Sequence, residues 1–390
     1  MKLFHPSATL LIFLILIQGC ENKSATEEEP SVSFNSPITN NKKIHYQTLH
    51  LDSLLLDPVP TSFVGKISIP DNRLLFIDQK LCWVFEFDST GKLVSTHIGQ
   101  GKKPDELPTK KISFFAPTSE GGYFFIGSSW DCFVFDRHFH RTDDYEINWH
   151  LANPKNEPAQ RPDPSQTDVY SLAYTLSNIL IDHNTIYLPL FAQARTFNPT
   201  TPGYDADARV LATMDIRDGY VNKLMGRLSP MYLNNKAIQT LSYLSFDLVP
   251  GDKMLISYPA DSLIYVSDRN FHILSRFGAS GRAINTDYIP LDHPLNLWKV
   301  WYKQTQEKGY YRSIKYIPQR QLLFRSYQKD KYPASDGLQI YRGDTLVADL
   351  DVPRGFNVEG YIAPFFYSNS FMNEEKETIT IYKFKLDSYE

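Results

Sequence analysis

The sequence has few of the features by which most enzymes and nucleic-acid-binding proteins are identified. It holds only 3 cysteines in 390 residues, which excludes a disulfide-rich scaffold. Lysine and arginine form no cluster and the formal net charge is −4, so we expect no nucleic-acid partner. The sequence contains no Gly-x-Ser-x-Gly elbow, no His-Glu-x-x-His pair and no glycine-rich phosphate or nucleotide loop. We therefore predict no catalytic residue, no cofactor and no metal site, and a non-enzymatic role is favoured over an enzymatic one.

Long hydrophobic runs are also missing, and the one apolar stretch that stands out lies at the N-terminus. Residues 10–17 are apolar, follow a basic start and are too few to span a bilayer, which is typical of a secretory signal. The sequence Ile-Gln-Gly-Cys then ends at Cys20 and resembles the lipobox of bacterial lipoproteins. The resemblance implies a signal peptide over residues 1–19, followed by lipidation and acylation of Cys20. The alternative is a soluble secreted protein in which this cysteine occurs by chance.

Residues 20–41 follow as a segment of mostly polar composition. They are rich in Ser, Thr, Asn, Pro and Glu and show no sustained periodicity, so we predict a flexible lipidated tether. The acidic run Glu27–Glu29 resembles export signals that send some Bacteroidetes lipoproteins to the cell surface, and a solvated charged linker is the alternative. We predict a lipid-anchored protein of the cell envelope that is held on the outer membrane. The anchor could lie on the periplasmic side or on the cell-surface side of this membrane.

Residues 42–390 show the pattern of one repetitive β domain. Aromatic residues are abundant, with 24 Tyr and 25 Phe, and helical periodicity is scarce. Strand-like runs alternate with turn residues such as Pro70-Asp71-Asn72. The first four runs cover residues 66–69, 73–78, 82–88 and 93–98. Four strands joined by tight turns are the content of one propeller blade.

The four-stranded unit returns with a period of about fifty residues, as a repeat architecture requires. Further copies begin near residues 111, 178, 244 and 311, and the third contains a long insertion. The last copy, over residues 361–386, has no room for an outermost strand, whereas the strand-like segment 44–51 lacks a partner. We predict that this segment completes the last blade and closes the ring. The expected fold is an all-β six-bladed propeller, with seven blades as the alternative.

The first copy also carries a family resemblance. The runs Val84–Leu93 and Ile98–Glu106 resemble a blade and its following loop in the NHL-like six-bladed propeller lipoproteins of Bacteroidetes. The whole chain is similar to the uncharacterised DUF4221 group. The resemblance implies the propeller fold, and it implies no particular chemistry because such propellers include binding proteins, interaction platforms and enzymes.

Two cysteines remain after Cys20, at related places in the first two copies. Cys82 and Cys132 both stand within apolar strand-like runs. A cysteine in such a run behaves as a small buried hydrophobic residue. We therefore expect these two to stay apart rather than form a disulfide.

One histidine pattern invites comparison with metal sites. The sequence His138-Phe139-His140, with His150 nearby, would place two imidazoles on one face of a strand. It follows Asp136, at the place where the equivalent Asp88-Ser89-Thr90 has the composition of a turn. We therefore expect an exposed hairpin here.

The long insertions hold the best candidates for ligand binding, because recognition residues of repeat folds lie on loops. Candidates are Trp149 and Arg161 in one insertion and Trp298, Trp301 and Tyr302 in another. The last three would share a helical face, and aromatic rings beside charged residues suit a peptide or a sugar ring. The alternative is that this helix packs its aromatic residues against the propeller.

Two classes of function follow. In the favoured one, the protein is a membrane-anchored, non-enzymatic binding or scaffold propeller for an envelope protein, a peptide or a glycan. In the other, it is a hydrolase or lyase of an extracellular polymer, with scattered carboxylates meeting at the central channel.

Overall fold

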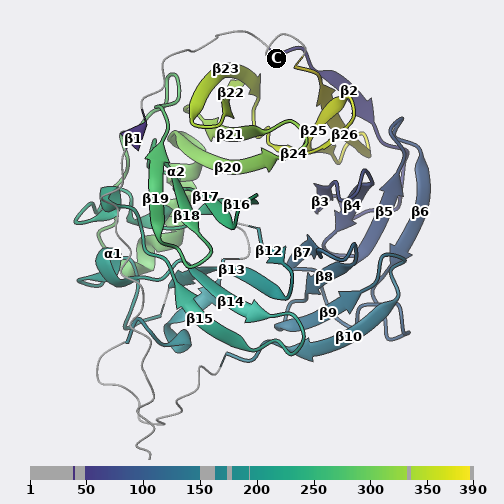
Figure 1. Ribbon diagram of the computed structural model, residues 1–390, viewed down its shortest axis with the longest axis horizontal. Coiled ribbons are helices and arrows are strands. Elements are labelled where there is room, and N and C mark those ends of the chain that lie inside the picture. The colour runs from purple at the N-terminus through teal and green to yellow at the C-terminus, as the bar shows by residue number, and fades with distance from the viewer. Residues whose placement is uncertain are drawn as a thin grey trace, which may run out of the picture. The chain divides into compact units, whose positions relative to one another are not determined.

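The computed structural model describes residues 38–39, 49–149, 163–173, 178–192, 194–331 and 335–386, which form a six-bladed β-propeller (Figure 1). The prediction of six blades is therefore confirmed. The predicted signal peptide, Cys20 and most of the predicted tether lie outside the described residues. Two residues of that tether are described and form β1 (Ile38–Thr39), which pairs in parallel with the outer strand of blade 4.

The first three blades follow one another along the chain, each as an antiparallel sheet. Blade 1 contains β3 (Gly65–Ser68), β4 (Leu74–Asp78), β5 (Trp83–Phe87) and β6 (Leu93–Ile98). Blade 2 contains β7 (Phe114–Pro117), β8 (Tyr123–Ile126), β9 (Asp131–Phe135) and β10 (Arg141–Glu146). Blade 3 contains β12 (Leu180–Asp182), β13 (Thr185–Ala192), β14 (Leu211–Asp215) and β15 (Val221–Met225), and β11 (Tyr170–Leu172) also pairs with β13.

The other three blades repeat the arrangement. Blade 4 contains β16 (Ser245–Val249), β17 (Lys253–Ser257), β18 (Ile264–Asp268) and β19 (Ile273–Phe277). Blade 5 contains β20 (Tyr310–Ile317), β21 (Leu322–Gln328), β22 (Ser335–Arg342) and β23 (Thr345–Pro353). Blade 6 contains β24 (Val358–Ile362), β25 (Phe365–Asn373), β26 (Thr378–Phe384) and, as its outer strand, β2 (Asp52–Leu55).

The ring is closed by the N-terminal strand β2, which pairs antiparallel with β26 (Figure 1). An N-terminal closing strand was predicted, but its predicted position, residues 44–51, was wrong. Residues 44–48 lie outside the described residues, and 49–51 form no strand. The closing segment lies further along because Leu54 and Leu56, only 8% and 2% exposed, pack into one core with residues of β26 and blade 1. The segment 49–51 offers only partly buried leucines to the neighbouring core.

A turn that begins with an aspartate closes the outer two strands in blades 1 to 4. Asp88 Oδ1 accepts hydrogen bonds from the backbone N–H groups two and four residues later. Asp136 and Asp268 repeat both bonds, and Asp215 repeats the first. Through such bonds the aspartate side chain satisfies backbone N–H groups of the turn that have no strand partner, and this fixes a tight turn. His138 and His140 are exposed in one of these turns, so the predicted hairpin is confirmed.

The two faces of the propeller carry different connections. Because the strands of each blade alternate in direction, the first-to-second and third-to-fourth turns all open on one face, which we call the turn face. All other connections open on the opposite face, the loop face, and this is where the inner strands begin. The longer described connections on the loop face cover residues 99–113, 194–210, 226–244 and 278–309.

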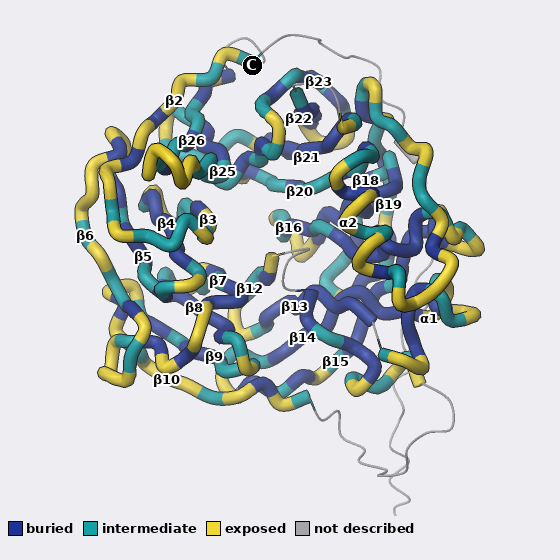
Figure 2. Tube along the Cα trace, turned by 180° about the vertical axis from the view of Figure 1, so that it is seen from behind, coloured by how far each residue is buried: buried dark blue, intermediate teal, exposed yellow. Residues whose placement is uncertain are grey.

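The middle strands of the blades are buried on both sides. Every residue of β4, β8 and β21 is buried, because each sheet is packed between two neighbouring sheets (Figure 2). Arg325 on β21 is fully buried and joins two blades: its guanidinium donates to Ser257 Oγ at 2.9 Å and to the carbonyl of Ser262 at 2.7 Å. Cys82 and Cys132 are also buried and are not joined in a disulfide, as predicted.

Helices are few among the described residues. They are α1 (Tyr204–Asp207), α2 (Leu297–Glu307) and four short 3-10 turns. No described helix is long and apolar enough to cross a membrane. The longer helix, α2, lies on the loop face within the connection from blade 4 to blade 5.

Candidate functional site

Helix α2 presents its aromatic residues in two directions. Trp298 and Tyr302 are 51% and 64% exposed. Trp301 is half-buried against the large core beneath the helix and meets the Trp298 ring edge-on, with centroids 5.7 Å apart. On the buried side, the Gln304 side chain bonds to the backbone N–H of Ile289 and to the Thr240 hydroxyl. The expected helix therefore exists, and it uses one tryptophan for packing while it leaves two aromatic residues exposed.

The candidates of the other insertion are only partly described. Trp149 is half-buried, and its ring meets the Trp130 ring edge-on with the ring centroids 4.9 Å apart. The backbone carbonyl of Trp149 accepts a hydrogen bond from the Thr167 hydroxyl. Arg161 lies outside the described residues, as does His150. Among the described residues, no group of three His, Cys, Asp or Glu side chains lies close enough together to hold a metal ion.

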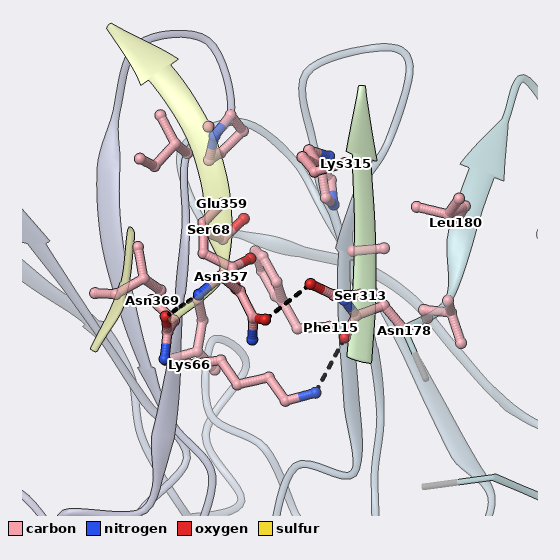
Figure 3. A pocket seen from close by; sticks show the side chains of 18 of the residues that line it. Lys66, Ser68, Phe115, Asn178, Leu180, Ser313, Lys315, Asn357, Glu359 and Asn369 are labelled. Atoms are coloured by element: carbon pink, nitrogen blue, oxygen red, sulfur yellow. Dashed lines mark hydrogen bonds between the residues drawn. The ribbon is translucent and has the colours of Figure 1, made fainter. Parts of the chain in front are cut away.

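A polar cavity lies at the centre of the ring (Figure 3). Its volume is about 570 Å³, and its lining comes from all six blades, chiefly from their inner strands. The side chains that face it include lysines, a carboxylate, amides, a hydroxyl and aromatic rings: Lys66, Lys315, Glu359, Asn178, Asn357, Ser313, Phe115 and Tyr361. We call this cavity the central channel. It is the site at which residues far apart in the sequence come together.

Two of the cationic groups in the channel wall have acidic partners. Lys315 Nζ lies 3.6 Å from Asp247 Oδ2, and that carboxylate also accepts the backbone N–H of Tyr316 at 2.7 Å. Arg312 donates to Asp336 Oδ2 at 2.8 Å. The Lys315–Asp247 pair links blade 5 to blade 4, whereas the Arg312–Asp336 pair lies within blade 5. The charges of both cations are compensated within the wall.

Lys66 and Glu359 are different, because neither has an ion-pair partner among the described residues. Lys66 Nζ donates to the neutral Asn178 Oδ1 at 3.0 Å. The side chain of Glu359 makes no hydrogen bond to a described residue. Burial raises the pKa of Glu359 to about 7, although Lys315 and Lys66 act to lower it. Burial likewise lowers the pKa of Lys66, against the opposing effect of Glu359.

The channel thus brings together one cation and one carboxyl group from adjacent blades without pairing them. Lys66 lies on β3 of blade 1 and Glu359 on β24 of blade 6, and these two strands are in contact. Lys66 is exposed and Glu359 is half-buried, so a ligand in the channel can reach both side chains. The arrangement is therefore suited to a polar ligand that contacts both groups.

The wall around this pair supplies amide donors and hydrogen-bonded positioning. Asn357 Oδ1 accepts from the Ser313 hydroxyl at 2.8 Å, and its backbone N–H donates to Asn369 Oδ1 at 2.7 Å (Figure 3). The amide nitrogens of Asn178 and Asn357 make no hydrogen bond to a described residue. Of the described residues that line the channel, Glu359 is the one that carries a carboxylate. The pair of carboxylates that most glycoside hydrolases use is therefore not assembled by these lining residues.

The sequence-based candidates did not include Lys66 or Glu359. Both stand in short inner strands, where a charged residue is ordinarily taken as exposed on an edge. The available signal was their position: the inner strand of each predicted blade has to border the central channel, so polar residues there are enclosed by the ring.

No family model matches the sequence, and no protein with a curated description is similar to it in sequence. The solved structures of similar fold include two from Bacteroides. One is a DUF4221 family member from Bacteroides vulgatus, with 12% identity and a TM-score of 0.60, covering 87% of this chain and 98% of that chain. The other is a candidate exported protein from Bacteroides fragilis, with 15% identity and a TM-score of 0.51, covering 89% of this chain and 98% of that chain. At such identities the likeness shows the fold, and in this it confirms the resemblance to DUF4221 propellers.

Proposed function

We propose that the protein is a lipid-anchored, non-enzymatic binding propeller of the cell envelope that receives a polar segment of a peptide, a glycan or an envelope protein in its central channel. The observation that carries the proposal is the pair Lys66 and Glu359, which line the central channel without an ion-pair partner among the described residues. Lys315 in the same wall is paired with Asp247, whereas Lys66 and Glu359 stay available to a ligand within a concave polar site.

The location outside the cytoplasm rests on the N-terminal sequence. The lipobox-like segment that ends at Cys20 supports lipidation, and the two buried thiols are compatible with an oxidising compartment because they are enclosed. One structure of similar fold is described as a candidate exported protein. Anchoring on the outer membrane is part of the same proposal.

The residues predicted from the insertions are proposed as secondary contacts. Trp298 and Tyr302 are exposed on α2, on the loop face from which the inner strands start. A ligand chain that enters the channel from this face would leave its remaining length above the loops. Trp149, Arg161 and Trp301 complete the set of candidates on these connections.

The test is a crosslinking pull-down from native membranes with the tagged full-length chain. A Cys20→Ala variant removes the lipid acceptor, and a Lys66→Met, Glu359→Ala double variant removes the charged pair of the channel. The proposal expects a reproducible partner or glycan that is captured by the parent chain and lost with the double variant. Capture that is unchanged by the double variant would move the binding site away from the channel.

A second function has one observation in its favour. A carboxyl group with a pKa near neutrality is suited to proton transfer, and Glu359 has this property. A hydrolase or lyase of an extracellular polymer would use it as the acid or base. Release of new chain ends from polysaccharides by the parent chain, abolished by Glu359→Gln, would establish this function instead.

A further inference from the structure

We propose that Lys66 and Glu359 bind hydroxyl groups of a sugar residue, so that the ligand of the central channel is the end of a glycan. This inference rests on the proposed binding function of the channel and names the class of ligand within it. It is argued from the charge balance of the wall, from the hydrogen-bonding capacity of the two groups and from their surroundings.

The charge balance favours a ligand without net charge at this pair. Arg312 and Lys315 are compensated by Asp336 and Asp247, which leaves one cation, Lys66, and one carboxyl group, Glu359. A free anion would be attracted by Lys66 and repelled by the ionised carboxylate of Glu359. A free cation would be attracted by the carboxylate and repelled by Lys66. Neither is matched to both groups at once.

A hydroxyl group is matched to both. An ammonium group can only donate hydrogen bonds and an ionised carboxylate can only accept them, whereas a hydroxyl donates and accepts. Different hydroxyls of one sugar residue or of a short glycan end can therefore accept from Lys66 Nζ and donate to Glu359. The pair also tolerates a change of charge, because a protonated Glu359 can donate to the same hydroxyl oxygen.

The rest of the wall offers what a sugar ring needs. The amide groups of Asn178 and Asn357 come from two different blades and can each form further bonds to hydroxyls (Figure 3). The rings of Phe115 and Tyr361 supply apolar surface for the C–H faces of the sugar. The volume of about 570 Å³ lies within the range of small-ligand sites, roughly 300–1,000 Å³.

The most direct competitor is the zwitterionic end of a peptide or amino acid. Its carboxylate would meet Lys66 and its ammonium would meet Glu359. That ligand binds best when Glu359 is ionised, so an uncharged amide in its place would remove the charge attraction and leave only a weaker hydrogen bond to the ammonium. A hydroxyl ligand would still find an acceptor and a donor in the same amide. The two ligands therefore differ in their response to Glu359→Gln.

The experiment measures binding of the full-length chain to two immobilised panels. The first contains oligosaccharides that end in hexoses, deoxyhexoses, N-acetylhexosamines or hexuronates, and the second contains peptides with free termini. We expect binding to members of the first panel, weakened about 10- to 100-fold by Lys66→Met and by Glu359→Ala. Glu359→Gln should retain binding to within about tenfold.

Matched controls are the exposed residues Lys92 and Glu120 on the turn face, whose substitutions Lys92→Met and Glu120→Ala should leave binding unchanged. Thermal melting of each variant shows that it is folded. Binding to peptides alone, with Glu359→Gln as damaging as Glu359→Ala, would overturn the glycan inference and leave the binding function in place. Sugar binding that is equally strong in the parent chain, in Lys66→Met and in Glu359→Ala would also overturn the glycan inference. Binding to neither panel by the folded parent chain would overturn the glycan inference, and the membrane pull-down decides the binding function separately.

Discussion

Replacing Glu359 with glutamine should stabilise the protein at high pH and leave its stability unchanged at low pH. The carboxyl group faces the central channel with no hydrogen-bond or ion-pair partner among the described residues, and burial raises its pKa from 4.5 to about 7. Between these two pH values the folded chain keeps a proton that the unfolded chain releases. The folded state therefore loses stability relative to the unfolded state as pH rises through this window. Glutamine keeps the shape of the side chain and cannot ionise.

The magnitude follows from the size of the pKa shift. A rise of about 2.5 units corresponds to a ceiling of about 3 kcal/mol in the free energy of unfolding, fully developed above pH 7. Because the channel is open to water, its effective dielectric constant is higher than that of a dry core, and we expect about 1–2 kcal/mol. For a domain of this size, that gain raises the melting temperature by about 2–3 °C.

The assay compares the melting temperatures of the parent chain and Glu359→Gln at pH 5 and at pH 8. We expect nearly equal values at pH 5 and a higher value for the variant at pH 8. Glu120→Gln, at an exposed turn residue, is the control and should give no difference that depends on pH. If the variant melts at or below the parent temperature at pH 8, Glu359 has a partner in the channel and the unpaired-charge argument fails.

Three other predictions concern the scaffold and the loops. In a Cys20→Ala chain, Cys82 and Cys132 should not react with a thiol reagent until the protein unfolds, because both side chains are buried and burial raises the pKa of Cys82 to about 12. Rapid labelling of the native chain would contradict this prediction. Arg325→Met should lower the free energy of unfolding by about 3 kcal/mol in denaturant titrations, since it leaves buried carbonyls of the neighbouring blade without a donor. Trp301→Ala should cost about 2–3 kcal/mol and Trp298→Ala less than about 1 kcal/mol in the same titrations, and equal losses would show that both rings pack.

The fold was largely predictable because a propeller repeats its information. Turn residues recur at fixed places, and the aspartate that starts the outer turn is readable at Asp88, Asp136, Asp215 and Asp268. Middle strands such as β4 and β8 are almost continuous apolar runs because both of their faces are covered. The closing strand was placed too early, since strand-like composition extends over residues 44–51 while burial selects Leu54 and Leu56.

The site was much harder to predict. A spacing of three and four residues between aromatic side chains correctly predicts a helix over Trp298, Trp301 and Tyr302. It does not say which ring packs inward, because that depends on the segment 226–244 beneath the helix. Lys66 and Glu359 are almost 300 residues apart in sequence, and only ring closure makes them neighbours. No local pattern contains that information.

The position of this pair also connects ligand binding to ring closure. Lys66 lies on the first strand of blade 1 and Glu359 on the first strand of blade 6, so the two residues stand on opposite sides of the junction at which the ring closes. The junction is held by β2, whose Leu54 packs with Ile67 of β3 and with Ile381 of β26. A ligand that contacts Lys66 and Glu359 together binds only the closed ring, and its binding free energy therefore adds to the stability of closure.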